Sequence, residues 1–282
     1  MIKKKSPAKI NLHLTVLRKR EDGYHDIMTL MQRISLYDEM TFASLPRGIV
    51  VKCPGSPLPE NDANIVYRAA QAYFSRTGYK QGIAITIRKK IPIAAGLGGG
   101  SSNAATTLVT LNEMTGGNLC EEELLELGEG LGADVPFFIF EKTAWATGTG
   151  TCLQEAVGIP RLWFVLVNPG FPISTKMVYE KLNFRLTSDV INYSIPPFKV
   201  GGGINPVVGL KNDLEKVTLT LHPFLKQLKQ SLIKYGSLGA LMSGSGPTVF
   251  GVFEREGEAR KAAKALRAEG RGDLGIYLAH SI

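Results

Sequence analysis

The stretch that decides the fold is Pro92-Ile-Ala-Ala-Gly96-Leu-Gly98-Gly-Gly-Ser101-Ser-Asn103. Its glycines permit positive φ angles and leave backbone N–H groups open to close approach. A helix is predicted directly after it, from about Asn103 to Met114, ended by Gly116 and Gly117. The first N–H groups of a helix have no partner within the helix, and the helix dipole is positive at that end. Together these features predict a phosphate-binding loop.

This loop differs from the better-known phosphate loops. No Gly-Lys-Ser/Thr follows, so it is not a Walker A loop, and serine stands at 101 where a dinucleotide fingerprint needs its third glycine. The His-Arg-Asp and Asp-Phe-Gly signatures of protein kinases are absent. A flexible turn before a helix is the structural alternative, but three successive glycines followed by Ser-Ser-Asn favour phosphate binding. Ser101, Ser102 and Asn103 can add donors or help to hold Mg²⁺.

The composition is that of a folded, globular protein. The 282 residues are 44% hydrophobic and 21% charged, which allows one large domain or two modest ones. The cysteines Cys53, Cys120 and Cys152 form no CxxC pair, and with four histidines a zinc site is not expected. A reducing cytoplasm fits this cysteine usage best. No apolar segment of a signal peptide follows Lys3–Lys5, and no run approaches the length of a membrane span.

The net charge of +8 favours anionic partners, either nucleic acid or phosphorylated metabolites. The basic clusters Lys3–Lys5, Arg18–Arg20 and Arg88–Lys90 are short, scattered and not interleaved with aromatic residues. Most of this charge is therefore interpreted as solvated surface.

Strands and helices are mixed along the chain without strict alternation, which predicts an α+β fold with two lobes and a boundary near 150–160. Strands are predicted at 8–16, 83–87, 162–167, 248–253 and 274–279. Helices are predicted at 64–76 with Asn64 as N-cap, from Glu121–Glu123 to Gly130 or Gly132, at 223–235 and at 257–268, with a long loop at 194–209. A second glycine-rich turn, Ser243–Pro247, precedes the strand at 248–253.

Two charged residues are candidates for chemistry. In the strand at 8–16, alternation predicts one buried apolar face and a polar face that carries Lys9 and Asn11. Asp134 stands in the apolar stretch Gly132–Phe138, and a buried carboxylate needs a partner, for which Lys9 is a natural candidate. Taken singly, Asp134 is more typical of a helix N-cap or turn start, and Lys9 of a solvated strand lysine. The pair indicates chemistry only in combination with the phosphate loop.

Three separated segments resemble the three motifs of the GHMP kinase family, which includes galactokinase, homoserine kinase and mevalonate kinase. They are Pro7–Leu12, Pro92–Ala105 and Leu241–Pro247, and their order and spacing match across nearly the whole chain. The resemblance implies a two-lobed fold. Residues 1–155 would form an ATP-binding and catalytic lobe like domain 2 of ribosomal protein S5, and residues 156–282 a ferredoxin-like α/β sandwich.

A further segment, Arg20–Asp26, resembles the Arg-x-Asp-Gly-Tyr-His element of the branch whose acceptor is a cytidine diphosphate derivative. Gly132–Phe137, Asn212–Glu215 and Pro169–Gly170 also resemble that branch. The resemblance implies that Asp134 is the base that accepts the proton of the substrate hydroxyl. It also implies that Lys9 is the second catalytic residue, which orients Asp134 and the hydroxyl and keeps Asp134 ionised through its charge. The implied substrate-binding residues are Asn11 near the reacting hydroxyl, Tyr24 and His25 on the cytosine, Tyr179 on its other face, and Gly244 and Ser245 in the second turn.

The resemblance also implies that the first glycine loop holds the phosphates of ATP, with Mg²⁺ bridging their oxygens. The residues concerned are Pro92, Gly96, Leu97, Gly98, Gly99, Gly100, Ser101, Ser102 and Asn103. No acidic ligand for the metal is evident, and among the loop residues Ser102 is the first candidate. Asn64 and Lys89–Lys90 are candidates for the nucleotide side.

The sequence therefore predicts an ATP-dependent kinase that phosphorylates a hydroxyl group of a small, anionic metabolite. Its expected partners are a small-molecule substrate and neither nucleic acid nor membrane, and the chain is expected to be a monomer or weak homodimer. Two alternatives stay open: another GHMP kinase acting on homoserine, mevalonate or a sugar, and a non-catalytic nucleotide- or nucleic-acid-binding protein. The segment at Tyr24 and His25 argues against the first, because those substrates carry no base.

Overall fold

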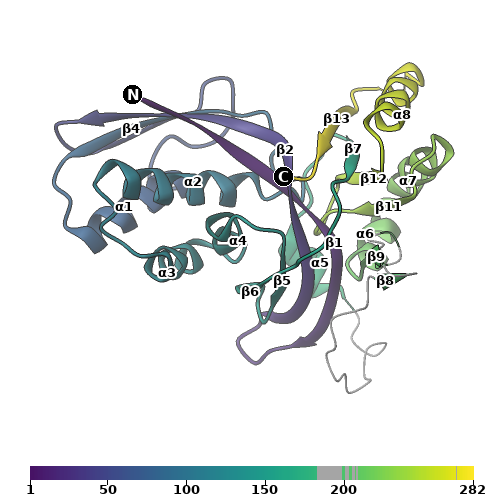
Figure 1. Ribbon diagram of the computed structural model, residues 1–282, viewed down its shortest axis with the longest axis horizontal. Helices are drawn as coiled ribbons and strands as arrows, with labels where there is room; N and C mark the ends of the chain where they lie inside the picture. Colours follow the sequence, from purple (N-terminus) through teal and green to yellow (C-terminus); the bar gives the residue numbers. More distant parts are fainter. Residues whose placement is uncertain (183–198, 201–202, 205–206, 208, 271) are drawn as a thin grey trace. The chain divides into compact units, whose positions relative to one another are not determined.

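The computed structural model describes residues 1–182, 199–200, 203–204, 207, 209–270 and 272–282 (Figure 1). The chain forms two compact units that interleave along the sequence. The first unit comprises Met1–Ala8, Leu36–Ile93 and Gly98–Lys142, and the second comprises Lys9–Ser35, Ala94–Leu97 and Thr143–Ile282. Because the units exchange segments, a single boundary at 155/156 remains a proposal about the family lobes.

The first unit packs helices against a small sheet. Strand β4 (Gly82–Arg88) pairs antiparallel with the second half of β2 (His25–Leu45) and parallel with β3 (Ile49–Lys52). Helices α1 (Ile65–Thr77) and α2 (Gly99–Met114) pack on each other, α1 contacts β3, and α3 (Glu121–Leu131) and α4 (Val135–Phe140) pack together (Figure 1). Alternate isoleucines of β4, at 83, 85 and 87, are buried, which confirms the predicted strand.

The helix ends of this unit follow the predicted signals with one exception. The side chain of Asn64 accepts a hydrogen bond from the Val66 N–H and caps α1 as predicted, and α3 begins at Glu121 as predicted. Helix α2, however, begins at Gly99 rather than near Asn103. Gly98 is its N-cap in the left-handed region (φ 67°) and offers no side-chain cap. The helix thus extends through Gly99 and Gly100 despite the low helix propensity of glycine, and its buried residues begin at Ser102.

Strand β1 (Ile2–Lys19) is longer than predicted and contributes residues to both units. The prediction of one buried face is wrong, because every residue from Ala8 to Val16 is buried. The polar residues of this stretch are Lys9, Asn11, His13 and Thr15, and none is more than 8% exposed. Alternation could not reveal this, because the polar face is covered by other segments and its side chains bond to one another and to those segments.

The second unit contains a four-stranded antiparallel sheet in the order β11-β12-β7-β13. These strands are β7 (Trp163–Asn168), β11 (Gly239–Met242), β12 (Val249–Phe253) and β13 (Gly275–His280). Helices α7 (Phe224–Lys234) and α8 (Glu256–Ala268) pack on this sheet (Figure 1). Strands β12 and β13 flank β7 on either side, which is the ferredoxin-like arrangement expected. The predicted elements at 162–167, 223–235, 248–253, 257–268 and 274–279 are thus confirmed.

The remaining strands and helices of this unit are short. They are β5 (Ala144–Thr147) and β6 (Cys152–Glu155), which form a hairpin, α5 (Thr175–Glu180), β8 (Lys199–Val200), β9 (Gly203–Ile204), β10 (Lys211–Asn212) and α6 (Glu215–Leu221). Strand β5 pairs with β2, and β10 pairs with β1. The loop predicted at 194–209 lies largely outside the described residues. Among the described helices, none has the length and apolar character needed to cross a bilayer.

Candidate active site

The N-terminus of α2 presents backbone donors at the glycine loop. The Gly98 carbonyl accepts the first helical hydrogen bond, from the Ser102 N–H at 2.9 Å. The N–H groups of Gly99, Gly100 and Ser101 therefore precede the helical ladder and have no acceptor within the helix. These three residues are partly or fully exposed, as Pro92, Gly96 and Gly98 are. The backbone of this turn can thus donate to an anion, with the helix dipole favouring negative charge.

Three other predicted loop residues, Leu97, Ser102 and Asn103, have buried side chains. The Ser6 hydroxyl donates to Ser102 Oγ at 2.7 Å, and Asn103 Nδ2 donates to Ser6 Oγ at 2.8 Å and to Asp38 Oδ2 at 3.0 Å. Because α2 starts at Gly99, Ser102 and Asn103 lie inside the helix rather than at its end. Their direct contact with phosphate or metal remains a prediction. In the structure their side chains bond to Ser6 and Asp38 and thereby hold the start of α2.

A row of buried polar side chains runs from β1 to β2 in the second unit. Lys9, 4% exposed, donates from Nζ to Asn11 Oδ1 at 2.7 Å, and Asn11 Nδ2 donates to Thr29 Oγ1 at 2.8 Å. The Thr29 hydroxyl in turn donates to the His13 carbonyl at 2.6 Å. The solvated-lysine interpretation of Lys9 is therefore excluded. Thr29 was missed from the sequence, since a threonine in a strand carries no functional signal by itself.

The three sequence motifs meet within this unit. The Lys9 N–H donates to the Leu97 carbonyl at 2.9 Å, which joins β1 to the first glycine loop. The Ser243 hydroxyl donates to the Gly96 carbonyl at 2.8 Å, which joins that loop to the second glycine-rich turn. A Cβ built on Gly244 would lie 3.5 Å from Asn11 Oδ1, so this turn also approaches the polar row.

The second turn is held by residues to which the sequence assigned no role. Asn212 Nδ2 donates to the carbonyls of Met242 at 2.8 Å and Gly244 at 2.7 Å. The hydroxyls of Ser245 and Thr175 lie 2.8 Å apart, in hydrogen-bond contact. The segment Asn212–Glu215 had been singled out only by resemblance, and its local signal is a common Asn-Asp turn.

Asp134 occupies the N-cap position of α4 but makes no side-chain capping bond. Pro136 and four further buried residues follow it in the helix, and Asp134 itself is half-buried. The capping interpretation therefore does not account for this carboxylate. Its role as a base remains a prediction.

The hairpin turn between β1 and β2 presents the predicted cytosine-binding residues. Asp22 Oδ1 accepts from the Tyr24 N–H at 3.0 Å, a bond that lowers the pKa of this carboxyl, and Gly23 adopts φ 86°. Arg20 donates to Asp22 at 2.9 Å and to Asp26 at 3.1 Å, which fixes the turn. Tyr24 is 66% exposed.

His25 and Tyr179 stack directly on each other, with ring centroids 4.9 Å apart and planes inclined by 25°. Both residues were predicted to lie in the cytosine site, and the fold brings their rings together although they are 154 positions apart in the sequence. Partial burial, with a smaller contribution from Lys19, lowers the pKa of His25 below its ordinary value. The lowered pKa favours the neutral imidazole at pH 7, in which one nitrogen donates and the other accepts.

The remaining candidates lie in internal contacts. Asn64 caps α1 and donates to the Pro59 carbonyl at 2.6 Å, and Lys89 is paired with Asp38. Lys90 is exposed and paired with Glu39 at 2.6 Å. In the described part of the chain, no group of three or more His, Cys, Asp or Glu side chains is placed to bind a metal ion.

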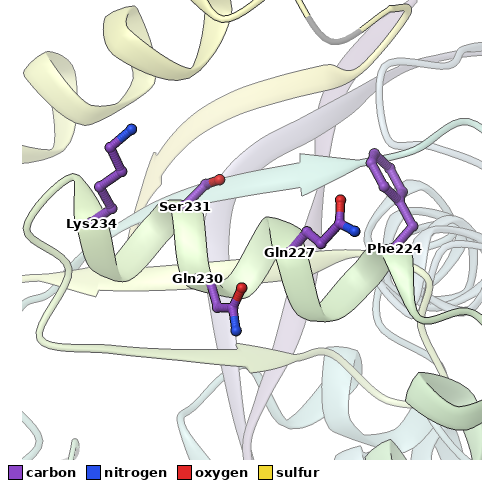
Figure 2. Close-up of a pocket in the computed structure, with 5 residues that line it drawn as sticks. All are labelled: Phe224, Gln227, Gln230, Ser231 and Lys234. Atoms are coloured by element: carbon purple, nitrogen blue, oxygen red, sulfur yellow. The ribbon is translucent and has the colours of Figure 1, made fainter.

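A surface pocket lies along α7 (Figure 2). Its lining residues are Phe224, Gln227, Gln230, Ser231 and Lys234, and none of them belongs to the predicted site.

Comparison with known proteins gives a consistent assignment. Residues 64–142 match the GHMP kinases N terminal domain, and residues 205–272 match GHMP kinases C terminal. The 4-diphosphocytidyl-2-C-methyl-D-erythritol kinase of Syntrophus aciditrophicus is 56% identical over 96% of both chains, and that of Geobacter sulfurreducens is 48% identical over 94% of both. A crystal structure of 4-(cytidine 5'-diphospho)-2C-methyl-D-erythritol kinase superposes with a TM-score of 0.84 at 33% identity over 99% of both chains.

Homoserine kinase from Cytophaga hutchinsonii shares the fold, with a TM-score of 0.74 at 18% identity over all of this chain and 94% of that one. The predicted fold class is thereby confirmed. This chain belongs to the GHMP kinase family, and within it to the 4-diphosphocytidyl-2-C-methyl-D-erythritol kinases.

Proposed function

We propose that this protein transfers the γ-phosphoryl group of ATP to the 2-hydroxyl of 4-diphosphocytidyl-2-C-methyl-D-erythritol. The products are the 2-phosphate and ADP, and the reaction belongs to non-mevalonate isoprenoid precursor biosynthesis. The observation that carries the proposal is the meeting of the three kinase motifs through Lys9, Gly96 and Ser243. Relatives that are 56% and 48% identical to this chain are named 4-diphosphocytidyl-2-C-methyl-D-erythritol kinase, which supports the choice of substrate.

The first glycine loop is the proposed site of the ATP phosphates. The N–H groups of Gly99, Gly100 and Ser101 precede the helical ladder of α2, and a helix N-terminus of this kind fits a triphosphate. When bound, Mg²⁺ neutralises charge on the phosphate oxygens, and Mg²⁺ usually keeps several waters and few protein ligands. We assign it no protein ligand beyond the candidate Ser102.

Asp134 is the proposed general base for the acceptor hydroxyl. The proposal rests on the match of Gly132–Phe137 to the family and on the place of Asp134, half-buried before the buried residues of α4. Lys9 and Asn11 would orient the acceptor, because their side chains are buried and joined by a 2.7 Å hydrogen bond. A long, mobile ammonium group is thereby held in one geometry, and positioning dominates phosphoryl transfer.

The hairpin turn at Tyr24 and His25, together with Tyr179, is the proposed cytosine site. A neutral His25 can both donate to and accept from the edge of a base, and the stack with Tyr179 fixes its ring plane. Tyr24 exposes its ring to solvent and offers a face on which a base can stack. Gly244 and Ser245 would contact the substrate from the second turn.

We propose further that the protein acts in the cytoplasm on a small-molecule substrate, without nucleic acid or membrane, as a monomer or weak homodimer. Residues 1–155 and 156–282 are the proposed family lobes, the first for ATP binding and catalysis.

A coupled ADP-release assay with Mg-ATP and a panel of acceptors tests the proposal. The panel contains 4-diphosphocytidyl-2-C-methylerythritol, its cytidine-free methylerythritol phosphate, mevalonate and homoserine. Turnover with the cytidyl compound alone is expected. Turnover with mevalonate or homoserine instead would support kinase activity but contradict the proposed cytosine site. Nucleotide binding without turnover on any acceptor would favour a binding protein.

A further inference from the structure

We propose that Asp38 is a positioning residue for the nucleotide site. Its side chain holds the segment 89–91 and the first turns of α2 in a fixed arrangement before ATP binds. The inference rests on the proposed placement of the ATP phosphates at the α2 N-terminus. Asp38 lies in β2, is fully buried, and takes no part in the chemistry proposed above.

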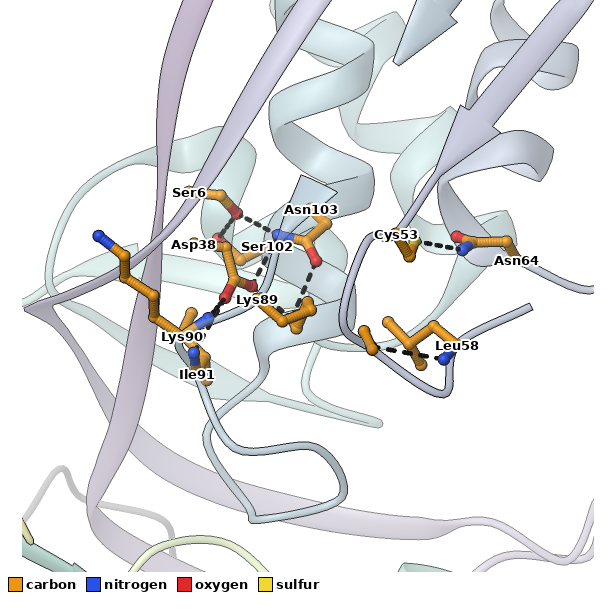
Figure 3. Close-up of polar contacts among 11 residues, drawn as sticks. Ser6, Asp38, Cys53, Leu58, Asn64, Lys89, Lys90, Ile91, Ser102 and Asn103 are labelled. Atoms are coloured by element: carbon orange, nitrogen blue, oxygen red, sulfur yellow. Dashed lines mark hydrogen bonds and ion pairs between the residues drawn. The ribbon is translucent and has the colours of Figure 1, made fainter. Parts of the chain in front are cut away.

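The Asp38 carboxylate accepts hydrogen bonds from donors on two different segments (Figure 3). Oδ1 accepts from the backbone N–H groups of Lys90 at 2.7 Å and Ile91 at 2.9 Å. Oδ2 accepts from the Lys89 ammonium and from Asn103 Nδ2 at 3.0 Å. One side chain therefore joins the segment 89–91, which directly follows β4, to the second turn of α2.

The network continues from Asn103 toward the open end of the helix. Lys89 Nζ donates to Asn103 Oδ1 at 3.1 Å, and Ser6 bonds to both Asn103 and Ser102. Lys89 Nζ and the Ile91 side chain also lie 3.0–3.3 Å from where a Cβ on Gly99 would be. The chain leaving Ile91 is the glycine loop itself. Any shift of Asp38 is thus transmitted to Gly99, whose N–H is among the proposed phosphate donors.

Asp38→Asn keeps the shape of the side chain but replaces one acceptor oxygen with an NH₂ donor. With Oδ1 kept for the Lys90 and Ile91 N–H groups, the new donor faces the Lys89 ammonium and Asn103 Nδ2. Donors then oppose donors in a buried site, and such groups are costly to leave unpaired. We expect the loop to shift and the KM for ATP to rise about tenfold or more, with the KM for the cytidyl substrate changed less than about twofold.

Glu39→Gln is the matched control. Glu39 is the next residue of the same strand and also pairs with a lysine of the loop, but this pair is 48% and 57% exposed. Exposed pairs contribute little, so both KM values should stay near wild type. Ser6→Ala is a second, milder variant, because Ser6 bonds to Ser102 and Asn103 and not to Asp38 itself within the described residues. For it we expect an increase of about threefold in the KM for ATP alone.

The experiment measures both KM values and the equilibrium Kd of ADP for the folded variants, with circular dichroism and Tm as folding controls. Higher KM for ATP and higher Kd for ADP, with the cytidyl KM unchanged, support the proposal. A lower Tm with unchanged ATP and ADP constants, or an equal rise in both KM values, overturns it in favour of a purely structural role. If Asp38→Asn does not fold, Ser6→Ala decides by the same criteria. Absence of turnover in the wild type would refute the reaction, while the ADP titration would still test Asp38.

Discussion

Gly96→Ala tests whether the contact between the two glycine-rich turns is required. Gly96 has φ 75°, and an ideal Cβ would lie 2.1 Å from the Ser243 carbonyl oxygen and 3.2 Å from the Gly246 nitrogen. Both neighbours are backbone atoms, which cannot rotate away as a side chain can. The first glycine loop and the second turn must therefore separate.

Two costs contribute to the expected loss of stability. The left-handed conformation costs a residue with a Cβ about 1–2 kcal/mol, and inserting a methyl group into a packed site costs about 1–3 kcal/mol. We expect the free energy of unfolding to fall by about 2–5 kcal/mol in Gly96→Ala. Gly78→Ala is the matched control, because Gly78 has φ 68° with open space around its Cβ and should lose only about 1–2 kcal/mol.

Urea unfolding and the ADP-release assay give the two readouts. Separation of the turns moves Leu97, whose carbonyl accepts from the Lys9 N–H, so we expect kcat/KM to fall about tenfold or more in Gly96→Ala. Gly78→Ala should keep wild-type kcat/KM, because Gly78 lies at the far end of α1. Equal stability losses in the two variants would refute the steric argument. A destabilised Gly96→Ala enzyme with wild-type kcat/KM would show that the contact has no catalytic importance.

Asp134→Asn should lower kcat by about 10²–10⁴-fold and leave both KM values nearly unchanged, since a general base contributes in the transition state; a folded variant with normal kcat would remove Asp134 from this role. His25→Ala should raise the KM for the cytidyl substrate about 10–100-fold and the KM for ATP far less, whereas equal effects would make His25 structural. Burial lowers the pKa of His13 below its ordinary 6.5, so the unfolded chain binds more protons below neutrality and the free energy of unfolding should fall as the pH drops through about 6.5. Urea unfolding at several pH values measures this slope, which His13→Gln should reduce; an equal slope in His13→Gln and the wild type would show that His13 does not contribute, since His25 also has a lowered pKa.

The fold could be predicted well because its elements carry strong local signals. The buried alternation of β4, the Asn64 cap and the acidic start of α3 each depend on residues within one turn or strand. The start of α2 was predicted four residues late, because three glycines normally indicate a loop. The buried hydrogen bonds of Ser102 and Asn103 with Ser6 and Asp38 hold the start of this helix, and no local sequence signal reports contacts over such separations.

The site could be predicted where residues belong to contiguous motifs, and not where the fold brings single residues together. His25 and Tyr179 were found only through the resemblance, since nothing local pairs two aromatic rings so far apart in the chain. Asp38 was missed altogether. An aspartate within a strand is typical of an exposed edge, and its four donors come from residues 51 to 65 positions away.

The polar face of β1 was expected to be solvated, but it is buried and carries residues proposed to orient the acceptor. Alternation predicts a solvated face wherever polar residues recur at every second position, because burying such groups without partners is costly. In β1 the cost is offset by specific bonds, from Lys9 to Asn11, from Asn11 to Thr29 and from His13 to the Gly209 carbonyl. Replacing bonded polar groups of this kind by well-packed apolar residues is often neutral or stabilising, so their bonds alone are weak evidence of a structural role. The proposed role of Lys9 and Asn11 in orienting the acceptor would give these polar residues a function, and the hydrogen bond from the Lys9 N–H to the Leu97 carbonyl joins their strand to the glycine loop.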